Sequence, residues 1–387
     1  MNAVKDHKEL AKYFSWHRLI AIVIKEFIQL LRDRGTLAVV IGIPIMQLIL
    51  FGYAINTNPK HLPTLIIAKD HSSFTRAFLT GIQNTDYFKI VGEAKDEAQA
   101  KRLLAQGRTQ FVITIPTDFT RKLLRGERPQ VLVDADATDP VATGSALSAI
   151  RVLPLTVFDH LLVGNLQSLR AAPPAIDLVA HTNYNPENIT QYNIVPGLLG
   201  VVLTLTLVMI TSACITKEKE KGTLENVLST PARPLEVMVG KITPYIMVGY
   251  VQALIIIITS YFLFAVPIEG NVCLLLLSAL PFIAANLSVG ITFSSIARTQ
   301  LQAAQAASFF FLPSLLLSGF MFPFAGMPMW AQCIGEALPL THFVRIVRGI
   351  MLKGNGLAQV WVDLWPIMLF MVIAMFIGLK RYRQTLD

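Results

Sequence analysis

The side chains that most often carry out chemistry are scattered along this sequence of 387 residues. The seven histidines form no HExxH pattern and lie close to none of the three cysteines, so we expect no metal site. Gly240-Lys241 lacks the upstream glycine and the following Ser or Thr of a phosphate-binding loop. Ser318-Gly319 has no His or Asp partner at a suggestive position and is more typical of helix packing or a kink. The sequence therefore predicts that the chain is not an enzyme and holds no cofactor.

The composition excludes the ordinary soluble classes. Hydrophobic residues make up 53% of the chain and charged residues 15%, with a mean hydropathy of +0.54, whereas soluble domains are about 25% charged. The net charge of +8 fits nucleic acid, an anionic membrane surface or loops on the cytoplasmic side of a bilayer. The position of the charges has to decide between these partners. Three scattered cysteines are too few for a disulfide framework.

Six apolar segments are long enough to cross a bilayer, because a spanning helix needs roughly 20 such residues. They are Leu37–Ile55, Ile194–Ile215, Ile242–Val266, Val272–Ala297, Ala303–Phe322 and Trp361–Leu379. Only the last contains a charged residue, Asp363, near its edge. The fold class predicted is an α-helical membrane protein with six transmembrane helices.

The basic residues indicate the orientation of these six spans. Sixteen Lys and Arg lie on the side that holds both termini, and three lie in the short loops of the other side. Because short cytoplasmic loops carry an excess of Lys and Arg, we expect both termini to be cytoplasmic, in a bacterial inner membrane. We expect no cleavable signal, and the first span is the expected insertion signal. This topology leaves no role for nucleic acid.

One segment, 56–193, has the composition of a soluble domain. Strand-like runs at Leu62–Ala68, Phe88–Gly92, Phe111–Ile115 and Val131–Asp134 alternate with helix-like runs at Ser72–Asn84, Asp96–Gly107, Thr117–Arg125 and Val141–Gln167. Such alternation is typical of an α/β domain. The predicted order is therefore a cytoplasmic N-terminus (1–36), span 1 (37–55), an inserted extracytoplasmic α/β domain (56–193), spans 2 to 6 (194–379) and a cytoplasmic tail (380–387).

An amphipathic helix precedes the first span. Trp16 and other apolar residues recur at helical spacing, while Lys25 and Arg32 lie on the opposite face. The pattern predicts a helix in the cytoplasmic membrane interface, with its basic residues near anionic lipid head groups. The alternative is a surface helix that packs on the protein.

The polar groups within the spans are almost all neutral. Neutral polar groups serve most often to hold helices together, and a proton relay would need ionisable groups that these spans lack. We therefore expect any energy for transport to come from another polypeptide.

The loop 216–241 is the segment through which such energy would enter. A charged run is followed by Gly222 and by a short predicted helix with Leu224, Val227 and Leu228 on one face, which Pro231 ends. The alternative is a solvated loop of mixed charge. On the other side, Pro323 and Pro339 break the region 323–360 into short re-entrant or interfacial pieces.

In their order relative to the spans, these features resemble the permease subunits of type 2 ABC exporters. The residues that carry the resemblance are Lys25-Glu26, Arg32-Asp33-Arg34, Glu218, Glu220, Gly222, Thr223, Glu225, Thr230, Pro231, Glu236, Gly240, Lys241, Leu317-Ser318-Gly319-Phe320, Pro323, Pro328, Pro339-Leu340-Thr341, Arg348-Gly349-Ile350 and Lys353-Gly354.

The resemblance implies a permease that pairs with a second copy or a paralogue and with two cytoplasmic ABC ATPase subunits, which bind the ATP and Mg. The segment from Glu218 to Leu228 would dock on the ATPase, and Glu218, Glu220 and Glu225 would pair with basic residues there. A periplasmic adaptor and membrane lipid are further expected partners. The uncharged path suits an amphipathic or hydrophobic substrate such as a drug, a bile-salt-like molecule or a lipid. The alternative function is a membrane sensor or envelope-assembly protein that binds through its external domain.

Overall fold

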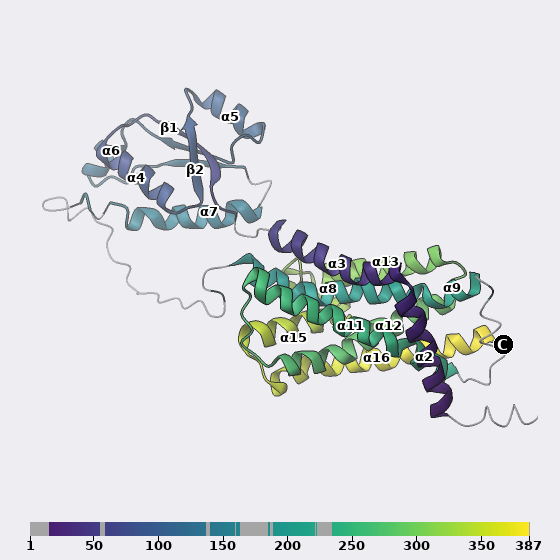
Figure 1. Cartoon of the computed structure of the whole chain (residues 1–387). Helices are drawn as coiled ribbons and strands as arrows, with labels where there is room; N and C mark the ends of the chain where they lie inside the picture. Colours follow the sequence, from purple (N-terminus) through teal and green to yellow (C-terminus); the bar gives the residue numbers. More distant parts are fainter. Residues whose placement is uncertain are drawn as a thin grey trace, which may run out of the picture. The chain divides into compact units, whose positions relative to one another are not determined.

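The computed structural model describes residues 15–54, 59–136, 140–158, 160–162, 185, 189–220, 222 and 234–386. The chain forms two compact units (Figure 1). One comprises Met1–Ile55 and Tyr184–Asp387, and the other comprises Asn56–Asn183. The described part of the first unit is helical, and the second is built on a β-sheet.

The second unit contains a four-stranded sheet in the order β2-β1-β3-β4. Its strands are β1 (Leu62–Ala68), β2 (Phe88–Glu93), β3 (Phe111–Ile115) and β4 (Leu132–Ala135). β1 pairs in parallel with β2 and β3, and β4 pairs antiparallel with β3. The bounds of β1 and β3 are those predicted from the sequence, and those of β2 and β4 differ by one residue.

Helices cover both faces of this sheet because successive strand residues point to opposite sides. The helices are α4 (Ser73–Asn84), α5 (Glu97–Ala105), α6 (Phe119–Leu124) and α7 (Pro140–Val152), followed by the short η1 (Leu153–Leu155). Phe111, Ile113 and Ile115 pack with α4, α6 and α7, whereas Val112 packs with α5. The unit is thus a three-layer α/β sandwich. The predicted helix Val141–Gln167 is observed as α7 and η1, and its last residues lie outside the described ranges.

The first unit is a bundle of long apolar helices (Figure 1). In chain order they are α2 (Trp16–Arg32), α3 (Arg34–Ala54), α8 (Thr190–Ser212), α9 (Cys214–Glu220), α11 (Pro234–Phe264), α12 (Val272–Ile296), α13 (Gln300–Leu317), η3 (Phe324–Gly326), α14 (Met329–Glu336), α15 (Pro339–Lys353) and α16 (Leu357–Leu386). α8 is the central helix and packs against α3, α11, α12, α13 and α15. α16 packs on α12 and α15 and leaves a broad apolar face exposed.

Among the described residues, four helices are long and apolar enough to cross a membrane, at Thr190–Glu220, Leu235–Phe264, Val272–Ile296 and Leu357–Arg381. The pair Trp16–Arg32 and Leu37–Tyr53, bent by 66°, gives a fifth if it counts as one span. The structure therefore supports four or five of the six predicted spans. The predicted span Ala303–Phe322 is observed as α13, whose first six residues include three glutamines that lower its hydropathy.

A proline in α3 explains one buried polar contact between the helices. Pro44 has no N–H, so the carbonyl of Val40 has no helical donor one turn later. Gln252 Nε2 of α11 donates to Val40 O at 2.9 Å, and Thr206 Oγ1 of α8 donates to Gln252 Oε1 at 2.8 Å. Gln252 thus links three helices. It also supplies a hydrogen-bond donor to the Val40 carbonyl, which would have none in the hydrocarbon region of a bilayer.

We expect Gln252→Leu to lower the free energy of unfolding by about 1 kcal/mol, the order measured for hydrogen bonds between membrane helices. Unfolding in mixed micelles of increasing SDS fraction measures this loss. The matched control is Gln305→Leu, because Gln305 is exposed on α13 and should cost nothing. In a Pro44→Ala background the loss should shrink, since alanine at this position would supply the missing N–H. An equal loss in both backgrounds would contradict this account.

Candidate functional site

A cluster of four buried or half-buried charges joins α2, α9 and α11, and we call it the ion cluster. It consists of Lys25 and Glu26 of α2, Glu218 of α9 and Lys241 of α11. The side chains of Lys241, Glu26 and Glu218 are 2%, 4% and 9% exposed, and that of Lys25 is 50% exposed. The two positive and two negative charges balance, which is the condition for burying them together.

Each lysine of the ion cluster contacts both glutamates. Lys241 Nζ lies 2.8 Å from Glu218 Oε1 and 3.1 Å from Glu26 Oε1. Lys25 Nζ lies 3.0 Å from Glu26 Oε1 and 3.1 Å from Glu218 Oε1. Charge-assisted hydrogen bonds of this length are roughly twice as strong as neutral ones. The arrangement fixes α9 to α2 and α11 near the start of the loop 216–241.

Further polar contacts tie the same three helices together around the ion cluster. Arg18 donates through Nε and Nη2 to both carboxylate oxygens of the buried Glu236 on α11, at 3.0 and 2.8 Å. Lys217 Nζ of α9 lies 3.1 Å from Asp33 Oδ2, directly after α2. Glu220 accepts hydrogen bonds from the backbone and side-chain nitrogens of Gln300 at the start of α13. The short helix α9 is therefore held by α2, α11 and α13.

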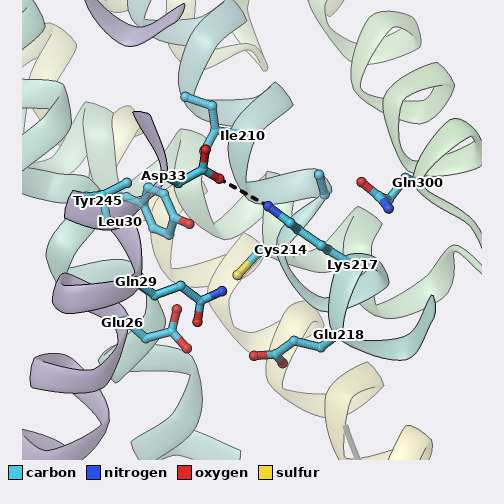
Figure 2. A pocket seen from close by; sticks show the side chains of 11 residues that line it. Glu26, Gln29, Leu30, Asp33, Ile210, Cys214, Lys217, Glu218, Tyr245 and Gln300 are labelled. Atoms are coloured by element: carbon cyan, nitrogen blue, oxygen red, sulfur yellow. Dashed lines mark hydrogen bonds and ion pairs between the residues drawn. The ribbon is translucent and has the colours of Figure 1, made fainter. Parts of the chain in front are cut away.

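A cavity of about 230 Å³ lies beside the ion cluster (Figure 2). Its lining residues are Glu26, Gln29, Leu30, Asp33, Ile210, Ala213, Cys214, Lys217, Glu218, Tyr245 and Gln300. Cys214 Sγ lies 3.8 Å from Lys241 Nζ. Among the described residues, no group of three or more His, Cys, Asp or Glu could hold a metal ion. The site offers fixed charges that are paired with one another.

The predicted interface helix packs on the protein with part of its polar face. Lys25, Glu26 and Arg18 contact α9 and α11, whereas Trp16 is 68% exposed on the same helix. Arg32 is exposed near the end of α2. Lys25 is half exposed and pairs with Glu26 and Glu218, so its placement at lipid head groups stays a prediction. α2 thus packs on α11 with one face and exposes apolar residues such as Trp16, Ile20 and Ile24 on another.

Only part of the predicted coupling segment lies in the described residues. Glu218 and Glu220 are engaged within the chain, by the ion cluster and by Gln300, and not held free for a partner. Gly222 adopts a left-handed backbone with φ of 68°, which glycine tolerates best. Thr223, Leu224, Glu225, Val227, Leu228 and Pro231 lie outside the described residues, so their role stays a prediction.

Among the predicted external residues, Arg348 contacts the backbone of Gly319. Its guanidinium donates to the carbonyls of Gly319 at 3.0 Å, Phe320 at 3.3 Å and Asn193 at 3.3 Å. Gly319 has a φ of 76° and follows Ser318, which caps the end of α13. Pro323 precedes η3, and Pro339 is the first residue of α15. Arg348 thus fixes the break after α13 against α8 and α15.

Comparison with known families decides the identity of this bundle. The model of the family described as "ABC-2 family transporter protein" matches residues 34–380. The chain belongs to the ABC-2 family of transporter proteins. The match covers α3, the α/β unit and all later helices, so the resemblance to type 2 ABC exporter permeases is confirmed.

Relatives of this ABC-2 chain are similar over nearly its whole length. The probable multidrug ABC transporter permease YbhS of Escherichia coli is 29% identical over 380 residues, which is 96% of this chain and 98% of that protein. The probable multidrug ABC transporter permease YbhR of the same organism is 26% identical over 91% of this chain and 95% of its own length. ABC transporter G family member 20 of Dictyostelium discoideum is 24% identical over 98% of this chain, but the match spans 53% of that protein.

The ion cluster was not predicted as a unit. The six predicted spans stop short of its members, because Lys241 precedes Ile242 and Glu218 follows Ile215 in the sequence. The available signal was that charged residues of both signs flank the ends of several apolar runs. Pairing them required the fold, since Glu26 and Lys241 are separated by 215 positions.

Proposed function

We propose that this chain is the membrane-spanning permease subunit of an ATP-driven exporter. A separate ABC ATPase subunit binds ATP and Mg and supplies the energy, and a second permease, identical or paralogous, completes the path. The family match supports this proposal, as does the chain's similarity to proteins named permeases. The relative from Dictyostelium is named as an ABC transporter, and the region that it shares with this chain makes up 53% of its length. This supports a permease that works together with a further part of the transporter.

The observation that carries the proposal is the ion cluster at the base of the segment 221–233. α9 leads into this segment and α11 follows it, and Glu218, Lys241 and Glu26 hold both helices to α2. Because buried charge pairs resist separation, a push on the segment reaches the three helices together. ATPase closure would thus tilt α2, α9 and α11 as one body and change the access to the path.

The substrate we propose is amphipathic or hydrophobic, such as a drug, a bile-salt-like molecule or a lipid. Apart from Asp363 near the edge of α16, the predicted spans contain no Asp, Glu, Lys or Arg, so a strongly charged solute would find few counter-charges along its path. Two relatives are named as probable multidrug permeases, which fits this class.

The proposed setting is a bacterial inner membrane, with both termini and the ion cluster cytoplasmic. The α/β unit and the region from η3 to α15 would then lie outside, where a periplasmic adaptor or membrane lipid would contact them. The excess of Lys and Arg in the short loops on the side of the termini supports this orientation. α13 would be the fifth span in chain order, with Phe309, Leu312 and Leu316 of its second half exposed to lipid or to the second permease.

The test is affinity purification of the tagged full-length chain in mild detergent, followed by assay of the co-purified ATPase. Replacing residues 222–228 by seven Gly and Ser residues should lower the retained ATPase activity about tenfold or more, equivalent to at least about 1.4 kcal/mol of binding free energy. The replacement keeps the length of the connection, so α9 and α11 stay joined.

The matched control is the same replacement over residues 125–131 of the α/β unit, which should retain the ATPase. Both variants should show the unfolding midpoint of the parent bundle. An ATPase that persists after the change at 222–228 would contradict the coupling role. A folded parent chain that retains no ATPase would contradict the exporter proposal and favour a sensor or assembly function.

A further inference from the structure

His342 is buried near the start of α15, between α14 and α16. Its side chain is 8% exposed. Nδ1 lies 2.9 Å from Asp363 Oδ1 of α16, and Nε2 lies 2.9 Å from the backbone carbonyl of Glu336 at the end of α14. One imidazole ring therefore joins three helices of the region that follows α13.

The two partners of His342 determine the protonation of the ring. A backbone carbonyl can only accept a hydrogen bond, so Nε2 must carry a proton. An ionised carboxylate also only accepts, so Nδ1 must carry one as well. Both contacts are satisfied together only by the imidazolium form beside an ionised Asp363. A neutral ring has one N–H and would lose one of the two hydrogen bonds.

Charged groups from each adjoining element face this ring. Glu336 Oε2 of α14 lies 3.6 Å from Nε2. Arg345 of α15 donates to both carboxylate oxygens of Glu336, at 3.1 and 2.6 Å, and lies 3.5 Å from Asp363 Oδ1. The helices α8, α12 and α13, which also pack on α15, contain no Asp, Glu, His, Lys or Arg. The four charges of Glu336, His342, Arg345 and Asp363 balance only when the ring is protonated.

The surroundings favour the protonated ring on balance. Burial by itself lowers the pKa of His342, but the hydrogen bond to Asp363, the carbonyl of Glu336 and the charges of both acids outweigh it and raise the pKa above its ordinary value of 6.5. The stabilisation is therefore complete below the ordinary histidine pKa. It is lost as the pH rises through the higher pKa of the folded protein.

We propose that His342 is a proton-binding site that holds α14 against α15 and α16, so that proton release loosens this segment. Release leaves a net negative charge among Glu336, Arg345 and Asp363. It also breaks the link from α14 to α16 through His342 and leaves only the one through Arg345, which contacts both Glu336 and Asp363. α14 and η3 follow the break after α13, and Arg345 stacks over the ring of Phe324 in η3 at 4.6 Å. Loosening therefore extends from α14 to η3. This site goes beyond the proposed export function and does not depend on it.

The test uses Cys333, which is exposed on α14, as the attachment point for a nitroxide spin label. Cys214 and Cys273 are replaced by Ser, and the labelled full-length chain is placed in lipid nanodiscs, where buffer reaches both faces. We expect an immobilised label at low pH and a mobile fraction that grows with a midpoint above 6.5, the ordinary pKa of histidine. In Asp363→Asn the midpoint should fall, because the charge that favours the imidazolium is lost.

His342→Gln should abolish the pH dependence of the label. His160→Gln is the matched control, since His160 is exposed in the α/β unit and its loss should leave the titration unchanged. A label whose mobility does not vary with pH in the folded parent would overturn the proposal, as would a titration that survives in His342→Gln. If His342→Gln does not fold, the shift in Asp363→Asn decides, and an unchanged midpoint there overturns the proposal. The assay contains no ATPase, so its failure leaves the exporter proposal untouched.

Discussion

Lys241→Met should lower the free energy of unfolding of the helical unit by about 3–5 kcal/mol, the usual cost of removing one partner from a buried ion pair. Lys241 is 2% exposed, and its ammonium group contacts both glutamates of the ion cluster. Without it, the half-exposed Lys25 alone faces two buried carboxylates. Unfolding in mixed micelles of increasing SDS fraction measures the loss.

Two further variants separate charge from packing at Lys241. Lys217→Met is the matched control, because Lys217 pairs with Asp33 at a partly exposed position and such pairs contribute about 0–1 kcal/mol. The double variant Lys241→Met with Glu218→Gln should recover a large part of the lost stability, because it removes the carboxylate left in excess. A small loss in Lys241→Met, or no recovery in the double variant, would show that the cluster is not a buried ionic link.

The consequence for transport follows from the rigidity of this link. If the ion cluster makes α2, α9 and α11 one body, the double variant should recover a large part of the stability and still transmit force poorly, since the remaining charged pair, Lys25 with Glu26, lies within α2. Full transport in the double variant would mean that covalent connection and apolar packing suffice to move α11. The stability and transport assays thus test the geometry and its proposed use separately.

The sequence predicted elements well where the apolar pattern alone decides them. β1 and β3 are mostly apolar strands, each with one threonine, whose ends coincide with the predicted bounds, and α12 differs from its predicted span by one residue. α11 begins at Pro234, before the predicted span start at Ile242, because its first turns carry two charged residues, Glu236 and Lys241, which pair with Arg18 and Glu26 of α2. Contacts of this kind join distant parts of the chain and leave no local pattern in the sequence.

The candidate sites likewise include features that a local sequence pattern shows and contacts that only the fold shows. The charged loop between the second and third apolar runs is visible in the sequence, because a short charged segment between two spans interrupts the apolar pattern. The pairing of His342 with Asp363 was not predicted, because the sequence showed only that the histidines form no metal-binding pattern. Helical spacing places a residue on a face, but only the packing of α14, α15 and α16 shows that the ring is enclosed by acids and a carbonyl.

The second large effect is expected at Gly290, where α12 approaches α8 most closely among the glycines of these helices. A Cβ placed there would overlap Thr211 Oγ1 and lie 2.8 Å from the carbonyl oxygen of Val208. Both neighbours belong to α8, which is held by helices on all sides and has little room to move. Gly290→Ala should therefore destabilise the bundle by about 2–3 kcal/mol, as overpacked cores do.

A second glycine, Gly42, serves as the control for this prediction. Gly42 lies in the middle of α3 with no atom within 4 Å of an added Cβ, so Gly42→Ala should be neutral or stabilising by up to about 1 kcal/mol. Thr211→Ala should recover part of the loss in Gly290→Ala, because it removes the hydroxyl that the new methyl group meets first. Equal effects at the two glycines would mean that helix propensity, and not the close contact between α8 and α12, determines the cost. A loss confined to Gly290 and relieved through Thr211 would establish that contact as the point about which the core of the bundle packs.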